Sequence, residues 1–262
     1  MKPNWILLTA GFFPVEMAAA AKRVENQAKK LYPFAQVIRL SKENIEIYCP
    51  KLTSKYPDKL SIKTPGYGYA AWKAEAVYSA LSGNYGPCDG VVWVDAGCEI
   101  NSSIISNLKF RRMLIKAASK GHLAFALNSP EAKFTKKKVW NLFPESVGVD
   151  PEIQYQATYF MLYGSEGKDL ARSIFLPIYE NFEILDPTIL EVDESEELEL
   201  AKCEQSILSL AIKSQNRVSA MKVPPAGNRG LISQLRGIFD PVWVSRNRTG
   251  ESIIPNWIRR IP

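Results

Sequence analysis

The stretch Asp89-Gly-Val-Val-Trp-Val-Asp-Ala-Gly-Cys-Glu-Ile-Asn101 decides the fold that we predict for this chain. Its apolar run is typical of a buried strand. The run ends at Asp95, and small residues then lead to a second carboxylate, Glu99. Open α/β sheets bind ligands at the carboxyl ends of their strands, so we expect both carboxylates to meet a cation, a ribose or a sugar hydroxyl. The alternative is a structural loop in which Asp95 caps a helix that begins near Ser102.

Strand patterns and helix patterns alternate outward from this stretch. The expected strands are residues 5–9, 36–40, 90–94, 122–127 and 156–163. The expected helices are residues 15–31, 70–81, 102–119, 135–143, 167–181 and 198–213, with the acidic run 193–199 at the start of the last one. Residues 41–65 and the chain after residue 223 have the composition of irregular segments, and a short helix within 41–65 is the alternative there. This order predicts an α/β fold in which helices flank a mixed, mainly parallel central sheet.

The composition is that of a globular protein with a sizeable core. The 262 residues are 46% hydrophobic and 23% charged, which excludes a disordered or fibrous chain. No segment is long and apolar enough to cross a bilayer, so we expect a cytoplasmic protein. The net charge of +6 suits phosphate-bearing ligands or an anionic membrane surface. No basic helix with interleaved aromatic residues supports nucleic-acid binding.

Cysteine and histidine point away from a metal or nucleophile site. None of the four cysteines, at positions 49, 88, 98 and 203, lies in a CxxC pair, so we expect free thiols in a reducing compartment. The single histidine, His122, starts an apolar run. Any Ser-His-Asp mechanism would have to use His122, but we expect a structural role for it.

A second motif is Gly66-Tyr-Gly-Tyr-Ala-Ala-Trp-Lys73. Glycines before a helix let backbone amides approach an anion at the positive helix end, and Lys73 adds charge there. The aromatic residues of the motif are suited to stacking on a base or a sugar ring. The alternative is an aromatic turn that packs on the sheet.

Two weaker motifs lie on predicted helices. Arg23 can pair bidentately with a phosphate, although a surface charge is the alternative. Cys203-Glu-Gln-Ser206 begins a late helix, and Glu204 is suited to a sugar acceptor or a metal, with an exposed helical turn as the alternative.

These motifs, taken in order, resemble bacterial glycosyltransferases of the GT-A type, which use nucleotide-diphospho-sugars to build capsular and surface polysaccharides. The resemblance covers roughly the first 210 residues. It is carried by Arg23 and Gln27-Ala28 on the first helix, by 66–73, by 93–101 in the slot of the Asp-x-Asp motif, and by 204–210 in the slot of the late Asp-Gln-Ser segment.

The resemblance implies a single GT-A-like domain over residues 1–262. In such a domain, residues 1–101 form the nucleotide-sugar-binding half, residues 102–222 the acceptor half, and residues 223–262 a C-terminal extension. The implied activity is transfer of a sugar from a nucleotide-diphospho-sugar to a saccharide or lipid-linked saccharide acceptor.

The resemblance also implies roles for particular residues. Asp95 and Glu204 are the expected catalytic residues, and Asp95 with Glu99 would hold a divalent cation, manganese or magnesium. The acceptor or the sugar would meet Gln154 and Gln205. The expected nucleotide-sugar-binding residues are Thr9, Arg23, Tyr67, Gly68, Trp72, Lys73, Asp95, Ala96 and Gly97. Among them, Lys73 and Arg23 would offset the charge of the departing diphosphate.

The chain departs from the GT-A pattern in three places. Gly97 stands where the second Asp of Asp-x-Asp is usual, no histidine follows His122, and Glu204 replaces the late Asp. These departures permit a metal-independent enzyme or one that has lost activity. The second of these gives the alternative function, a non-catalytic nucleotide- or sugar-binding relative of the same fold.

The tail mixes Trp, Ile and Arg in residues 242–248 and 253–262. Such segments bind at anionic interfaces, so we expect peripheral membrane contact through the tail, compatible with a lipid-linked acceptor. The alternative is a tail that folds back on the body, with Trp243 and Trp257 packed inside.

Overall fold

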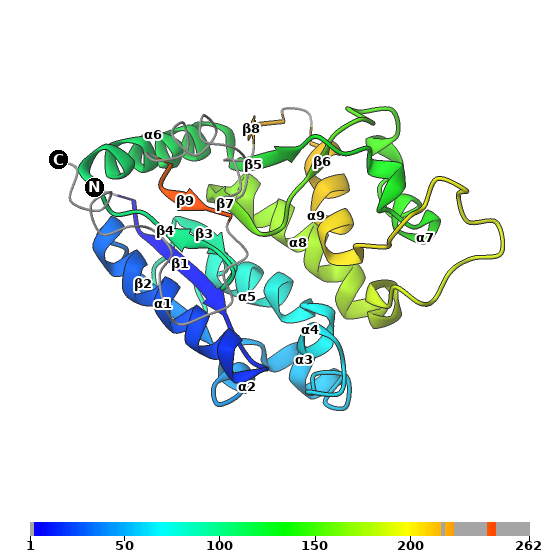
Figure 1. Ribbon diagram of the computed structural model, residues 1–262, viewed down its shortest axis with the longest axis horizontal. Helices are drawn as coiled ribbons and strands as arrows, with labels where there is room; N and C mark the ends of the chain where they lie inside the picture. Colours follow the sequence, from blue (N-terminus) through cyan, green and yellow to red (C-terminus); the bar gives the residue numbers. More distant parts are fainter. Residues whose placement is uncertain (1–2, 216–217, 223–239, 245–262) are drawn as a thin grey trace.

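The computed structural model describes residues 3–215, 218–222 and 240–244, and a seven-stranded sheet runs through it (Figure 1). The sheet order is β2-β1-β3-β7-β5-β6, with β8 paired to β5. The strands are β1 (Trp5–Ala10), β2 (Gln36–Leu40), β3 (Gly90–Val94), β5 (His122–Leu127), β6 (Gln154–Tyr155), β7 (Tyr159–Tyr163) and β8 (Ala220–Lys222). Only β6 and β7 run against the others. The predicted mixed, mainly parallel sheet is confirmed.

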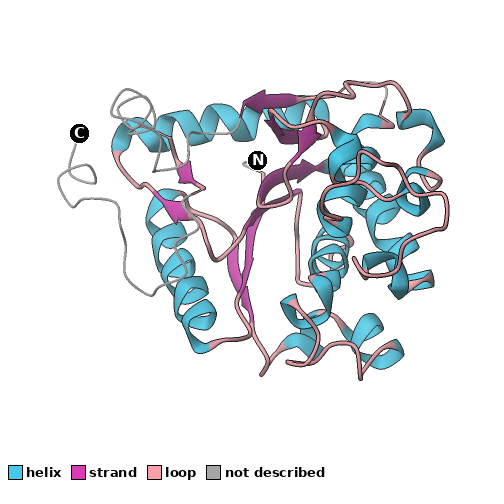
Figure 2. Ribbon diagram, turned by 45° about the vertical axis from the view of Figure 1, so that its right-hand side comes forward, coloured by secondary structure: helices cyan, strands magenta, loops and turns pink. Residues whose placement is uncertain are grey.

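Helices cover both faces of this sheet (Figure 2). One face packs against α1 (Val15–Leu31) and α6 (Ile104–Lys120). The other face packs against α5 (Ala71–Leu81), α8 (Gly164–Glu180) and α9 (Cys203–Lys213). The shorter helices are α2 (Ile45–Tyr48), α3 (Pro50–Lys55), α4 (Gly66–Tyr69) and α7 (Lys137–Trp140), and single 3-10 turns lie at Glu131–Lys133, Pro144–Ser146 and Phe182–Leu185.

Strand β3 is buried on both faces, as its continuous apolar run predicts. Val91 and Trp93 pack toward α5 and α8, whereas Val92 and Val94 pack toward α1 and α6. The strand pairs with β1 in parallel and with β7 antiparallel. Its central position carries the residue that follows it, Asp95, to the edge of the sheet.

A two-stranded sheet lies beside the Asp95 loop. Its strands are β4 (Glu99–Ile100) and β9 (Val242–Trp243), which pair antiparallel. Val242 is buried in the core on the α1 and α6 side of the main sheet. For these two residues of the tail, the folded-back alternative is correct. Trp257 and the rest of the tail from residue 245 lie outside the described residues.

The second half departs from the expected elements. The helix expected over residues 135–143 is reduced to α7, and the last long helix begins at Cys203 rather than near residue 198. The acidic run therefore does not form the first turn of α9. Asp193 forms an ion pair with Lys137 instead, and Glu199 pairs with Lys133 at 2.6 Å. These acids are neutralised across the surface by lysines near α7, not by a helix dipole.

Candidate functional site

An open pocket of about 790 Å³ lies at the carboxyl end of β3, where the sequence predicts a ligand site. The polar residues in its wall include Asp95 from the loop after β3, Thr158 from the segment before β7, and Glu204 and Gln205 from the first turn of α9. The remaining lining residues are Pro65, Gly66, Tyr69, Ala157, Leu185, Pro187, Ala201, Lys202 and Cys203.

Two of these lining residues, Asp95 and Glu204, meet the buried side chain of Lys73, and we call these three residues the Lys73 cluster. The ammonium of Lys73 lies 3.0 Å from Oδ1 of Asp95 and 2.9 Å from Oε1 of Glu204. It also donates to the carbonyl oxygen of Ala157 at 3.0 Å. The indole of Trp93 lies under the ammonium, 5.0 Å from Nζ to the ring centroid, and donates to Oδ1 of Asp95 at 2.6 Å.

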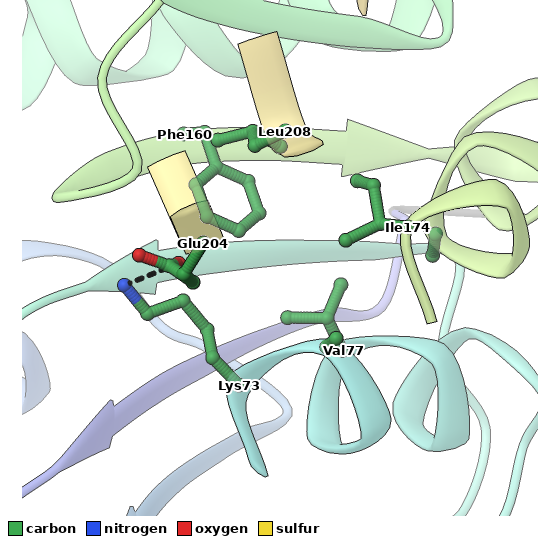
Figure 3. A pocket seen from close by; sticks show the side chains of 8 residues that line it. Lys73, Val77, Phe160, Ile174, Glu204 and Leu208 are labelled. Carbon is green, nitrogen blue, oxygen red and sulfur yellow. Dashed lines mark ion pairs between the residues drawn. The ribbon is translucent and has the colours of Figure 1, made fainter. Parts of the chain in front are cut away.

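The two carboxylates and the lysine differ in their contact with solvent. The Lys73 side chain is only 6% exposed, whereas the side chains of Asp95 and Glu204 are 34% and 21% exposed. Beside the Lys73–Glu204 pair lies a second, apolar pocket, walled by Phe160 and by aliphatic residues that include Val77 and Ile174 (Figure 3). Water is therefore kept from one side of the pair, which strengthens its electrostatic interaction.

Burial changes the ionisation of both partners. Burial alone would lower the pKa of Lys73, but the neighbouring Asp95 and Glu204 carboxylates outweigh it and raise that pKa. Burial raises the pKa of Glu204, and the opposing effect of Lys73 does not cancel the rise. The site therefore combines a permanently charged lysine with a carboxyl group whose proton affinity is increased, as expected of a group that exchanges protons.

A strained turn forms one wall of the pocket. Residues 66–70 all have positive φ, between 51° and 92°, and the amides of Tyr69 and Ala70 donate to carbonyl oxygens four residues earlier. This single left-handed helical turn includes α4, and it costs roughly 1–2 kcal/mol for each residue other than glycine. At Gly68 a Cβ would lie 2.4 Å from Leu60 Cδ2, so glycine is required there.

The aromatic residues of this segment mostly pack on one another. Tyr67 stacks on Phe12 at 4.5 Å, and Trp72 is 7% exposed and donates from its indole to the carbonyl of Gly66 at 3.1 Å. The expected stacking of Tyr67 and Trp72 on a ligand is therefore replaced by support of the turn. Among the described residues of the motif, Tyr69 is the aromatic side chain that lines the pocket.

The expected diphosphate partner Arg23 has a different role. Its guanidinium donates to the carbonyl oxygens of Ala96 at 3.0 Å and Cys98 at 2.8 Å, and it lies 3.6 Å from Oε1 of Glu99. Gln27 donates to the other oxygen of Glu99 at 2.9 Å. Arg23 and Glu99 are 6% and 0% exposed. Both side chains therefore hold the Asp95 loop from beneath, and Glu99 does not share the pocket with Asp95.

Other expected binding residues also lie beneath the site. Thr9, in β1, is fully buried, and its hydroxyl has no hydrogen-bond partner within the described part of the chain. Ala96 packs against α1, and Gly97 follows it in the half-buried part of the loop. Helix α6 is capped by the Ser103 side chain, so Asp95 does not have the capping role of the structural alternative.

Gln154 and Gln205, the expected acceptor residues, are joined to each other. Nε2 of Gln205 donates to Oε1 of Gln154 at 2.5 Å, but only Gln205 lines the pocket. Gln154 is fully buried and donates to Glu131 at 3.0 Å. A direct contact between Gln154 and an acceptor is therefore not available in this arrangement.

Two polar residues of the pocket, Lys202 and Thr158, were not predicted from the sequence. Lys202 precedes α9, and its ammonium lies 3.7 Å from the ring centroid of Phe134. Thr158 accepts a hydrogen bond from the amide of Asp95 through its carbonyl, at 2.9 Å. Neither residue belongs to a recognisable motif, since the fold alone brings them to Asp95.

His122 and the cysteines have no place in this pocket except for Cys203. The Nε2 atom of His122 accepts a hydrogen bond from the amide of Ser219 at 3.0 Å, and burial lowers the pKa of this imidazole. Burial raises the pKa of the Cys203 thiol, which is unfavourable for a nucleophile.

No helix in the described part of the chain has the length and apolar character needed to cross a membrane. No family model matches the chain, and no curated protein matches its sequence.

Among solved structures, the chain is similar to three glycosyltransferases. The first is the bifunctional glycosyltransferase WbbM, at 9% identity and a TM-score of 0.46, over 93% of this chain and 46% of that chain. The second is involved in glycosylation of the major capsid of PBCV-1, at 10% identity and a TM-score of 0.40, over 67% of this chain and 66% of that chain. The third is mouse xyloside xylosyltransferase 1, at 8% identity and a TM-score of 0.42, over 94% of this chain and 99% of that chain.

This chain thus spans less than half the length of WbbM. At such identities and TM-scores the likeness is one of coarse fold, and it says nothing about substrate or chemistry.

Proposed function

We propose that this protein is a glycosyltransferase that moves a sugar from a nucleotide-diphospho-sugar to a saccharide or lipid-linked saccharide acceptor. One observation carries the proposal. Asp95 and Glu204 both form ion pairs with Lys73, and both line an open pocket at the carboxyl end of β3. The two carboxylates lie 109 positions apart in the sequence. Two partly exposed carboxylates of different environment are suited to divide substrate binding and proton transfer between them.

Glu204 is the proposed general base. Its raised pKa brings its proton affinity closer to the operating pH, which favours proton transfer from a hydroxyl. The acceptor oxygen would form a bond to the anomeric carbon of the donor while the bond from that carbon to the diphosphate oxygen breaks. The acceptor proton goes to Glu204, and the electron pair leaves with the nucleoside diphosphate.

Asp95 is the proposed donor-sugar residue. Its Oδ1 atom accepts from both Lys73 and Trp93, so these two residues hold the carboxylate in one orientation. Its second oxygen is used by neither of them and is suited to accept a hydrogen bond from a sugar hydroxyl. Gln205 and Tyr69 line the same pocket and add polar contacts for a saccharide.

Thermal unfolding against UDP-, GDP-, CMP- and dTDP-sugars tests the proposal. A ligand that binds only the folded state raises the unfolding temperature by mass action. We expect one nucleotide class to raise it in the wild type, and donor hydrolysis or transfer to be lost in Asp95→Ala. The matched control is Asp89→Asn, at the opposite end of β3, where the carboxylate accepts from the amide of Asn4 at 2.7 Å. The absence of a shift at saturating concentration with every nucleotide would contradict the proposal.

A second candidate is a non-catalytic nucleotide- or sugar-binding protein. The observation that favours it is that Lys73 already pairs with both carboxylates of the pocket. This candidate predicts the same thermal shift without turnover. Detectable sugar transfer that depends on Glu204 would eliminate it.

We also propose a peripheral membrane contact for a cytoplasmic enzyme acting on lipid-linked acceptors. The net charge of +6 supports it, since anionic vesicles attract a basic protein. Co-sedimentation with anionic vesicles should be reduced when residues 245–262 are deleted. Equal sedimentation of the two proteins would contradict a role for the tail.

A further inference from the structure

We propose that the ammonium of Lys73 is a built-in cation that takes the place of a divalent metal between Asp95 and Glu204. The inference deepens the proposed function, because it rests on these two carboxylates being the working groups of the site. It also replaces the expectation that Asp95 and Glu99 hold manganese or magnesium.

The hydrogen-bonding capacity of Lys73 is fully used. A lysine ammonium has three N–H donors. They meet Asp95, Glu204 and the carbonyl oxygen of Ala157, at 3.0, 2.9 and 3.0 Å. A metal that bound Asp95 and Glu204 together would have to displace this ammonium from all three acceptors.

The oxygen donors at this position are engaged by Lys73 and are not arranged around a metal. Magnesium takes six ligands and calcium six to eight, mainly carboxylate, carbonyl and water oxygens. The expected second ligand, Glu99, is fully buried and is held by Arg23 and Gln27. Within residues 3–215, 218–222 and 240–244, no group of three or more His, Cys, Asp or Glu side chains is arranged to hold a metal ion. The residues at this position therefore fit a lysine better than a divalent cation.

The surroundings of Lys73 stabilise its charge. The face of Trp93 lies 5.0 Å from Nζ, and a cation over an indole ring is attracted by the ring quadrupole. The two carboxylates raise the pKa of Lys73 despite its burial, so the ammonium stays charged throughout the neutral range. The chain thus supplies one positive charge where a divalent metal would bring two.

This arrangement changes which side chain is expected to contact the diphosphate leaving group. Because its three donors are engaged, Lys73 acts on the leaving group through its charge and not through a direct hydrogen bond. Among the described residues that line the open pocket, the cationic side chain is that of Lys202, just before α9. Lys202 is the residue placed to contact an anionic leaving group.

Binding of Mn²⁺ alone, followed by electron paramagnetic resonance, tests the inference. We expect the wild type and Asp95→Asn to bind Mn²⁺ equally, because Asp95 holds no metal in the wild type. In Lys73→Met, which keeps the length of the side chain and removes its charge, the freed carboxylates should bind Mn²⁺ at least about tenfold more tightly, or ~1.4 kcal/mol. Adding Asp95→Asn to Lys73→Met should abolish the gained site.

The matched control is Lys202→Met, which removes a cation from the same pocket without freeing Asp95 and Glu204 and should gain no Mn²⁺. A wild-type Mn²⁺ site that Asp95→Asn removes would overturn the inference, and so would a folded Lys73→Met protein without the gain. If Lys73→Met does not fold, the comparison of wild type with Asp95→Asn still decides. Metal binding is measured without any sugar, so its outcome is separate from that of the transferase proposal.

Discussion

Two buried lysines of this protein each meet a carboxylate, but in opposite settings. The Lys73 cluster borders an open pocket through its two carboxylates, which are 34% and 21% exposed and hold one ammonium between them. The second pair, Lys213 with Glu131, has its atoms 2.8 Å apart, and both side chains are 0% exposed. Both pairs involve α9, one at each end of the helix.

The Lys213 pair is closed and fully hydrogen-bonded. One oxygen of Glu131 accepts from Thr135 and Gln154, and the other accepts from Ser209 and Lys213. Lys213 also donates to the carbonyl oxygen of Asp150 at 3.0 Å. A carboxylate whose lone pairs are all engaged and that does not reach solvent holds segments of the chain together.

The comparison separates a pair that suits the proposed reaction from a structural one. In the Lys73 cluster the carboxylates outnumber the ammonium, and the excess negative charge faces the pocket. In the Lys213 pair the charges balance and polar neighbours complete the hydrogen bonds. Both groups consist of a lysine and carboxylates, so the exposure and the charge balance of each group distinguish their roles.

The largest effect that we expect is on the rate of sugar transfer. Glu204→Gln removes the proposed base and should lower kcat by roughly 10²–10⁴-fold, the usual contribution of general base catalysis. The thermal shift with the donor should persist, because the fold is retained. Steady-state kinetics with the nucleotide-sugar found by thermal unfolding is the measurement. A kcat within a few fold of the wild type would remove Glu204 from the reaction and break the contrast between the two clusters.

The next effect is on stability, where we expect the Lys213 pair to matter more than the Lys73 cluster. Lys213→Met leaves the buried Glu131 carboxylate without its cation and should lower the free energy of unfolding by roughly 3–5 kcal/mol. Lys73→Met should cost less, because Asp95 and Glu204 retain contact with solvent. Urea unfolding of both variants measures the difference. A larger loss in Lys73→Met would show that the pocket cluster is the main structural pair.

The smallest effect is a displacement of the pH profile. Because burial raises the pKa of Glu204 above its ordinary 4.5, this group is protonated and unable to accept a proton at pH values where a free glutamate still works. The rate should therefore fall on acidification at a pH above 4.5. A profile of kcat/KM against pH measures this limb, and Glu204→Gln should lose it. An acidic limb with its midpoint at or below the ordinary glutamate pKa of 4.5 would contradict the assignment of Glu204 as the base.

Much of the first half of the fold could be predicted from local patterns. Helix α1 and strands β2, β3 and β5 have the boundaries that apolar periodicity indicates, because each buries a regular face or a continuous run. The second half was predicted less well. The acidic run 193–199 and the expected first residues of the last helix, 198–202, form no helix. Asp193 and Glu199 pair instead with Lys137 and Lys133, contacts that no local pattern encodes.

The site shows the same division. Asp95 could be selected because it stands at the end of a strand, where ligands bind. Glu204 could be selected only through the resemblance of residues 204–210 to the late segment of GT-A enzymes. The roles of Arg23 and Glu99 could not, since one residue on α1 and another on β4 meet only after the sheet has formed. Burial then makes them mutual partners and removes both from the pocket.

By itself, the sequence determined an α/β fold, a buried strand that delivers Asp95 to the edge of a sheet, and a set of polar residues from which a site could be built. The tertiary structure alone decided which of them meet. It placed Lys73 between Asp95 and Glu204 and Lys213 against Glu131. The physical reason is that charge interactions depend on distance and desolvation. Both are properties of packed segments from distant parts of the chain.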